Sequence, residues 1–97
     1  MSDAVTLASC VRIPKGVLAH LLGDELVLLN LETGIYFSLN PVGTRIWQLI
    51  QIHPSRSLQE ILDILTEEYS VEMHRCRKDL FQLITRLQEN RLLEMSH

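Results

Sequence analysis

Hydrophobic residues change their spacing near the middle of the chain, from short continuous runs to runs with helical periodicity. The runs GVLAHLLG (residues 16–23) and ELVLLNL (25–31) are short, apolar and bounded by turn-forming pairs, which predicts two strands. IYFSLN (35–40) predicts a third strand, because Ile, Tyr and Phe favour extended structure. With tight connections between them, the three strands are expected to form an antiparallel meander.

Two helix starts are marked by capping residues. Asn40 and Pro41 supply an N-cap and a proline at the first helical position, where a missing N–H costs nothing. The first helix is therefore expected to begin here and to end before Pro54. The sequence SLQE at 57–60 matches a capping box, in which serine and glutamate each satisfy an exposed helix donor. It predicts a second helix that runs to about Tyr69.

The third helix is predicted to be the longest element, from about residue 73 to about residue 90. Cys76, Leu80 and Leu87 belong to its apolar stripe, with charged residues on the other side. Asn90 is expected to end the helix in the left-handed conformation. Beyond it, the next two leucines are expected to fold back on the core.

Three strands followed by three helices predict an α+β domain, with helices packed on one face of a small antiparallel sheet. Residues 1–10 have no clear period and are expected to form a loose arm, and residues 95–97 a frayed tail. A single domain over residues 11–94 remains. Its three-stranded sheet has two edges, and each must be paired, covered or protected by charge.

Composition narrows the class of protein. The chain has 97 residues, 46% of them hydrophobic and 22% charged, which fits one soluble globular domain. A chain this short buries only roughly 60 to 65% of its unfolded surface, which favours a binding module over an enzyme with a deep cleft. The net charge of −3 gives no general attraction to nucleic acid or to anionic membranes. Without a membrane-spanning run or a secretory signal, a cytoplasmic protein is expected.

Neither a metal site nor a catalytic pair is indicated. Cys10 and Cys76 lie far apart and form no CxxC motif, so buried reduced thiols are expected. The four histidines show no metal-binding spacing, and no cofactor is expected. His74 and Cys76 are two residues apart on a helix, about 200° around it, so they cannot share a proton. We therefore expect a protein that is not an enzyme.

Two stretches resemble a known family. They are VLLNLETGIYFSLNPVGTRIW (27–47) and YSVEMHRCRKDLFQLITRLQENRLLE (69–94), and they are similar to the PqqD-like peptide-binding domains, also called RiPP recognition elements. The resemblance covers about residues 11–94. Its most specific parts are Thr33-Gly34-x-Tyr36, Leu39-Asn40 and Ile46-Trp47, with Asp79 fitting the third helix. One departure is Arg91 after Asn90, where many relatives have glycine.

The resemblance implies a fold similar to winged helix-turn-helix domains and a role without chemistry. Members bind the leader segment of a ribosomally made precursor peptide as an extra strand beside the third strand, in a groove shared with the third helix. They present the precursor to a modifying enzyme or a leader protease. Among stand-alone relatives, the last helix resembles the lasso-peptide set more than the protein of the pyrroloquinoline quinone pathway.

The free edge of the third strand is the candidate site. In strand addition, an extended ligand pairs with such an edge and places alternate side chains in pockets. The edge would be the backbone of Ile35, Tyr36, Phe37, Ser38 and Leu39. Alternation puts Ile35, Phe37 and Leu39 on one face and Tyr36 and Ser38 on the other. Both sets contain an aromatic residue, and the helix-facing layer is assigned mainly to Tyr36 or to its neighbours.

The third helix offers two flanks beside its apolar stripe, and either could line the groove. One flank carries Arg75, Asp79, Gln82 and Arg86, and the other carries Arg77, Phe81, Ile84 and Gln88. The candidate ligand contacts are Arg75, Lys78, Asp79, Phe81 and Gln82. Phe81 lies off the stripe, so it is either a chance exposed aromatic or a ligand contact. The charges form either a solvated face or determinants of leader selectivity.

Two other functions fit the same order of elements. A winged helix-turn-helix regulator would bind DNA through a strongly basic helix, but residues 71–94 carry a net charge of only +1, from five basic and four acidic residues. Alternatively, the free edges of two copies could pair in a homodimer. The sequence favours leader-peptide binding over both.

Overall fold

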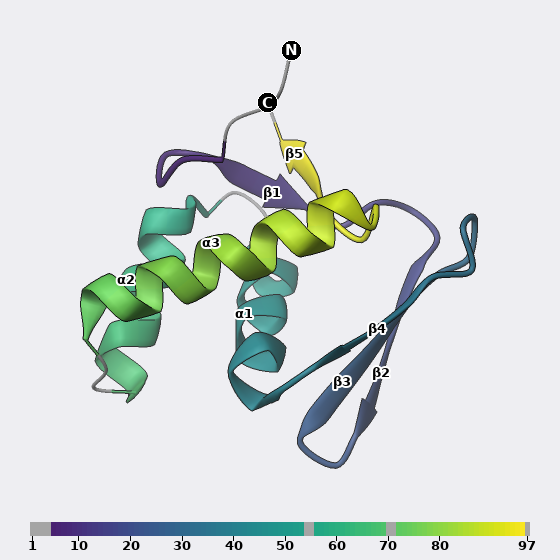
Figure 1. Ribbon diagram of the computed structural model, residues 1–97, viewed down its shortest axis with the longest axis horizontal. Coiled ribbons are helices and arrows are strands. Elements are labelled where there is room, and N and C mark those ends of the chain that lie inside the picture. Colours follow the sequence, from purple (N-terminus) through teal and green to yellow (C-terminus); the bar gives the residue numbers. More distant parts are fainter. Residues whose placement is uncertain (1–4, 54–55, 70–71, 97) are drawn as a thin grey trace.

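The computed structural model describes residues 5–53, 56–69 and 72–96, and it has the expected α+β architecture (Figure 1). The elements in chain order are β1 (Cys10–Arg12), β2 (Val17–Leu22), β3 (Glu25–Asn30), β4 (Tyr36–Leu39), α1 (Pro41–Ile52), α2 (Leu58–Tyr69), α3 (Met73–Glu89) and β5 (Glu94–Ser96). The three long strands and the three helices lie where the sequence predicts them. In the described ranges, no helix has the length and apolar content needed to cross a membrane.

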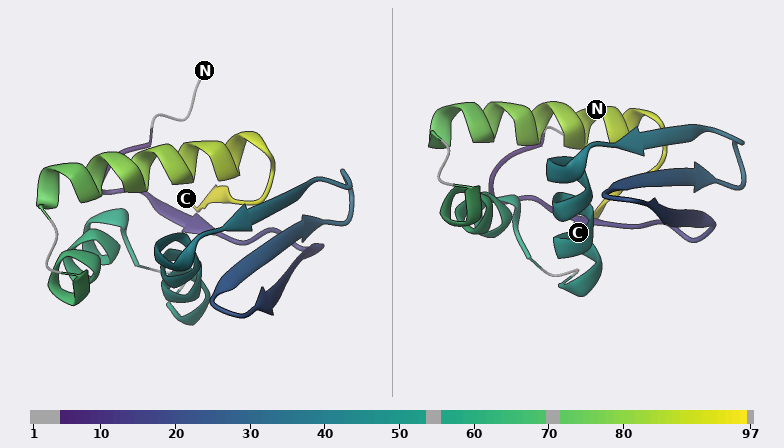
Figure 2. Two further views of the ribbon diagram at one scale, coloured as in Figure 1. Left: turned by 60° about the horizontal axis from the view of Figure 1, so that its bottom comes forward. Right: turned by 90° about the horizontal axis from the view of Figure 1, so that it is seen from below.

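The main sheet is an antiparallel meander in the order β2-β3-β4, as predicted. It extends away from the helices, and β4 runs beside α3 in the opposite direction (Figure 2). Gly34 takes a φ of +73° in the turn before β4, which a residue with a side chain rarely adopts. Leu26 pairs with Leu39 and Leu29 with Tyr36, so the register fixes which β4 side chains share a face with the core.

A second, two-stranded sheet pairs β1 with β5, which the sequence did not predict. The expected loose arm over residues 1–10 is therefore wrong for its described part. Leu7 and Ser9 accept backbone hydrogen bonds of 2.9 Å from the first turn of α2. The expected frayed tail at 95–97 is likewise wrong for residues 95 and 96, and residues 1–4 and 97 lie outside the described part. The physical reason is long-range pairing, which leaves no local pattern in either segment.

The helix starts follow the predicted capping. Asn40 Oδ1 accepts a hydrogen bond of 2.8 Å from the N–H of Gly43, and Pro41 begins α1. At the start of α2, Ser57 and Glu60 exchange the hydrogen bonds of a capping box at 3.3 and 3.5 Å. The start of each helix is thus fixed by capping side chains close by in the sequence.

The end of α3 corrects one prediction. Asn90 has a φ of −93°, and it is Arg91 that takes the left-handed conformation at +58°. The N–H groups of Arg91 and Leu92 bond back to Gln88 and Leu87, at 3.1 and 2.8 Å, in the pattern of a Schellman motif. The chain then turns inward, and Leu92 and Leu93 are buried as expected.

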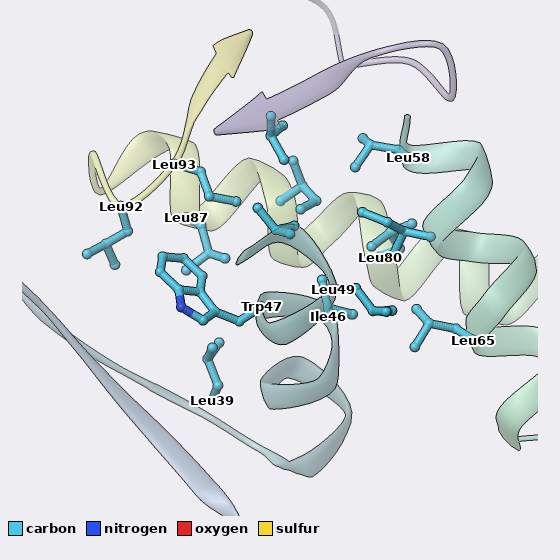
Figure 3. Packing of buried hydrophobic residues seen from close by; sticks show 14 of the residues in the cluster. Leu39, Ile46, Trp47, Leu49, Leu58, Leu65, Leu80, Leu87, Leu92 and Leu93 are labelled. Carbon is cyan, nitrogen blue, oxygen red and sulfur yellow. The ribbon is translucent and has the colours of Figure 1, made fainter. Parts of the chain in front are cut away.

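One hydrophobic core joins the helices to the sheet (Figure 3). Trp47 of α1 lies at its centre, with Leu39 of β4 on one side and Leu87 of α3 on another. Trp47 is only 1% exposed. Because α1 contacts β4 on one side and α2 on another, and α2 in turn packs against α3, this packing positions β4 relative to α3.

Candidate functional site

The outer edge of β4 presents unpaired backbone groups. In the sheet order, β4 is an end strand, and the described part of the N-terminal arm pairs with β5 and α2 instead. Ile35 C=O accepts a 3.0 Å bond from Asn30 N–H, which identifies these two as a bonded pair. Because bonded and non-bonded pairs alternate in an antiparallel ladder, Phe37 also faces β3 with its N–H and C=O. Tyr36 and Ser38 direct theirs outward.

The opposite edge of the sheet offers an internal comparison. Leu31 N–H donates a 2.9 Å bond to Gly16 C=O, so this pair is bonded. By the same alternation, Val17, Ala19 and Leu21 of β2 direct their N–H and C=O groups away from β3. Both edges are therefore open within the described chain, and only what lies beside each edge distinguishes them.

A hydroxyl fixes the end of β4 against α1. Thr44 Oγ1 accepts a 3.1 Å bond from Leu26 N–H and lies 3.4 Å from Leu39 C=O, to which it donates. Thr44 is buried, so the hydroxyl satisfies polar groups that water cannot reach. This bridge ties the end of the β3–β4 pair to the first turns of α1.

A groove of about 1240 Å³ runs beside this edge, between β4 and α3. Its lining comes from β4, the start of α1, the end of α2 and one flank of α3. The apolar lining residues are Phe37, Leu39, Val42, Ile46, Leu65, Tyr69, Leu80, Phe81 and Leu83. An open strand edge next to an apolar groove is the combination that strand addition requires.

The position of Phe37 identifies the face of β4 that borders the groove. Phe37 and Leu39 share the face of the buried Leu26 and Leu28. Tyr36 is 71% exposed, so its assignment to the helix-facing layer is wrong. The guanidinium carbon of Arg86 lies 5.2 Å from the centre of the Phe37 ring. This stacked pair joins α3 to β4 across the groove.

The candidate ligand contacts on α3 divide into two groups. Arg75, Asp79 and Gln82 line the groove, so the flank that they form is the one that faces β4. Phe81 also lines it, but it is half-buried and packs against the core, which corrects its interpretation as an exposed aromatic. Lys78 is exposed and does not line the groove.

An ion pair joins α1 to α2, the two helices that line the groove together with β4 and α3. Arg45 of α1 and Glu68 of α2 form two hydrogen bonds, of 2.7 and 3.0 Å. The hydrogen bond from Arg45 lowers the pKa of the Glu68 carboxyl and raises the pKa of the Arg45 guanidinium. The pair lies next to Tyr69, which lines the groove.

The ionisable groups in and around the groove are suited to binding a ligand and poorly suited to catalysis. Burial, followed by the Asp79 carboxylate, raises the pKa of the Cys76 thiol, which disfavours the reactive thiolate. Over residues 5–53, 56–69 and 72–96, no three His, Cys, Asp or Glu side chains are grouped as metal ligands. The groove can offer apolar surface, backbone pairing and a few fixed charges.

The structure brings together seven of the ten predicted contact residues. Phe37, Ser38, Leu39, Arg75, Asp79, Phe81 and Gln82 line the groove, whereas Ile35, Tyr36 and Lys78 do not line it. The sequence placed Arg86 on one of the two flanks that could line the groove but did not name it as a ligand contact, and it did not name Val42 as one either. Arg86 had a usable signal, because it continues the flank of Arg75 and Asp79 at helical spacing. Val42 had none, because its role depends on how α1 packs.

One protein family and two solved structures are similar to this chain. Residues 25–93 match the sequence profile of the family described as coenzyme PQQ synthesis protein D (PqqD). The solved structure of TbiB1 in complex with the TbiA(beta) leader peptide is 38% identical, with a TM-score of 0.78 over 86% of this chain and 94% of that chain. A lasso peptide synthetase B1 complexed with the leader peptide is 27% identical, with a TM-score of 0.76 over 87% and 96%. No curated protein matches the chain.

Proposed function

The chain belongs to the PqqD family, and on that basis we propose that it binds the leader segment of a ribosomally synthesised precursor peptide by strand addition at β4. Two similar proteins have been solved with leader peptides, and one of them is a lasso peptide synthetase B1. The lasso-peptide type is therefore the one we propose. The bound leader occupies the groove between β4 and α3.

The observation that carries the proposal is the position of the free backbone groups of Tyr36 and Ser38 beside the apolar groove. The β2 edge has the same backbone pattern, but the residues of β2 are not part of the groove lining. A peptide on β4 gains both backbone pairing and side-chain burial. On β2 it would gain chiefly the backbone pairing.

The energies explain why both contributions are required. Four backbone hydrogen bonds contribute about 2 to 6 kcal/mol in total. Association costs at least about 4 kcal/mol, and a flexible leader must also be ordered. Two or three apolar side chains, at about 1.5 to 3 kcal/mol each when fully buried, bring the sum to the roughly 8 kcal/mol of micromolar binding.

The test replaces one residue on each sheet edge with proline. Ser38→Pro removes an outward N–H of β4, and Ala19→Pro removes an outward N–H of β2, so both spare the bonds to β3. A leader peptide from a precursor encoded beside this chain would be titrated into each variant. We expect Ser38→Pro to weaken binding at least about tenfold, the equivalent of 1.4 kcal/mol. Equal affinity in the two variants would contradict strand addition at β4.

The bound precursor is presented to a modifying enzyme or to a leader protease of the same pathway, without chemistry by this chain. Support comes from the composition of the groove, which is apolar with a few exposed charges and includes a protonated, buried thiol at Cys76. A pull-down with the neighbouring pathway enzyme, with and without leader peptide, tests this role. Leader cleavage or modification by the purified chain alone would contradict it.

Pairing of two β4 edges in a homodimer would use the same backbone groups as the leader. We expect the two uses to compete, because the groups on Tyr36 and Ser38 can pair only once. Size-exclusion chromatography with and without a leader peptide distinguishes them. A dimer that persists at saturating peptide would place the contact between copies elsewhere.

A further inference from the structure

We propose that Arg86 selects an acidic side chain in the bound peptide, at the end of the groove where β4 begins. This inference rests on the proposed function, because it names the chemistry of the peptide that the groove takes. Arg86 lines the groove, and its guanidinium lies over the ring of Phe37. It thus stands beside the position that a bound strand would occupy.

The guanidinium of Arg86 is held in place and is available. Stacking on Phe37 restricts its rotation, so less side-chain entropy is lost when it binds a ligand. Within the described part of the chain, its side chain forms no ion pair with a carboxylate. A planar guanidinium with open donors recognises a carboxylate through two parallel hydrogen bonds. An acidic peptide side chain is therefore the ligand that this position fits best.

The two ends of the groove differ in charge. Arg86 lines the groove beside Phe37, where β4 begins. The opposite end is lined by Glu72, Arg75 and Asp79, which together carry one net negative charge. An acidic residue is attracted to the first end, whereas at the second end the two carboxylates outnumber Arg75 and make the same residue less favourable. The groove thus favours a peptide with its acidic residue beside Arg86, and it disfavours the same residue near Asp79.

The dimensions make this discrimination sharp enough to measure. Asp79 and Arg86 are separated by about 10 Å along α3, at 1.5 Å per residue. An extended peptide covers that distance in about three residues, at 3.3 Å per residue. Moving an acidic residue along the bound segment by about that much takes it from an end with a positive charge to an end with a net negative charge.

The test is selection of binders from a library of random peptides, each about 12 residues long. At 3.3 Å per residue, an extended peptide of this length is longer than the part of α3 that lines the groove. Wild type, Arg86→Gln and Arg77→Gln would each select binders. Arg77 is the matched control, because it stacks on Phe81 at 5.7 Å but does not line the groove. We expect enrichment of Asp or Glu at one position with wild type and Arg77→Gln, and loss of that enrichment with Arg86→Gln.

A charge exchange then distinguishes recognition from a structural role. One selected peptide would be synthesised with its acidic residue and with lysine in its place. We expect Arg86→Gln to weaken binding of the acidic peptide about two- to fivefold, as for a partly exposed ion pair. Arg86→Glu should prefer the lysine peptide over the acidic one. A merely structural role for Arg86 would lower the affinity for both peptides equally.

The possible outcomes distinguish the role of Arg86 from leader binding itself. Binders that share apolar positions but show no acidic enrichment would overturn the role of Arg86 and leave leader binding intact. Acidic enrichment that persists in Arg86→Gln would overturn it as well. If no variant enriches any peptide, both the inference and the proposed function fail. Loss of the acidic preference in Arg86→Gln alone, with reversal in Arg86→Glu, establishes it.

Discussion

Arg86 of α3 lies over the ring of Phe37 in β4, with 5.2 Å between its guanidinium carbon and the ring centre. The two residues come from elements that are otherwise separated by the groove. An exposed cation on an aromatic face contributes about 0.5 to 1 kcal/mol. The contact thus joins α3 to β4 across the groove and stabilises this arrangement by a modest amount.

A double-mutant cycle measures this contact. We expect Phe37→Leu and Arg86→Gln to show a coupling of about 0.5 to 1 kcal/mol in the free energy of unfolding, measured by urea denaturation. The control cycle pairs Phe37→Leu with Arg77→Gln, whose guanidinium stacks on a different ring. There the effects should add to within about 0.5 kcal/mol. Additive effects in both cycles would show that the stacking contributes nothing.

The Thr44 hydroxyl is expected to be required for the junction of β4 and α1. Thr44→Val keeps the shape of the side chain but leaves the N–H of Leu26 without its acceptor, which costs about 1 to 3 kcal/mol. Thr44→Ser keeps the hydroxyl and loses one methyl group, at about 0.8 kcal/mol. Chemical denaturation compares the two. A valine variant as stable as the serine variant would be evidence against the bridge.

Arg91 occupies a backbone position that glycine fills at lower cost. Its φ of +58° is unfavourable for a residue with a side chain, so Arg91→Gly should raise the free energy of unfolding by about 0.5 to 1 kcal/mol. Asn90→Gly is the matched control. Asn90 has a negative φ and its amide donates a 2.8 Å bond to Arg86 C=O, so this change should destabilise the protein. If both changes stabilised the protein, the positive φ of Arg91 would not be the cause of the effect.

The Arg45–Glu68 pair predicts a specific dependence on pH. The pKa of Glu68 is lowered in the folded protein, so its contribution is present above the unfolded pKa of a glutamate, about 4.3. The contribution is lost as the pH falls through the lower folded value. We expect Glu68→Gln to be less stable than wild type at pH 7 by at most about 1 kcal/mol, since the pair is partly exposed.

The stability difference between Glu68→Gln and wild type should close in acid. Thermal unfolding of both proteins from pH 7 down to pH 3 measures it. Glu67→Gln changes the neighbouring exposed carboxylate, which forms no ion pair among the described residues, so it should match wild type throughout. A gap that stays constant down to pH 3 would assign the effect of Glu68 to packing.

The elements with local signals were predictable from the sequence. Gly34 in its turn, Asn40 at its cap and the capping box that starts at Ser57 each act through neighbours within three or four residues. These turns and caps depend only on residues nearby in the sequence, so they can be predicted without knowing the rest of the fold. The three long strands and three helices follow from these signals and from hydrophobic spacing.

Long-range features were not predictable in the same way. The pairing of β1 with β5 joins segments of three residues from opposite ends of the chain, and neither segment has a strand pattern of its own. Tyr36 and Phe37 are both aromatic, so only the register against β3 decides which of them enters the groove. The flank of α3 that faces β4 depends on how the buried Leu80 and Leu87 rotate the helix against the core.

Hydrogen exchange at the β4 edge tests strand addition most directly. NMR would follow the amides of Tyr36, Phe37 and Ser38, with Ala19 on the opposite edge as the control. In the free protein, we expect Tyr36 and Ser38 to exchange quickly and Phe37 to be protected by its pairing with β3. A saturating leader peptide should slow Tyr36 and Ser38 by about tenfold or more and leave Ala19 unchanged. Unchanged exchange at Tyr36 and Ser38 in a saturated complex would contradict the account.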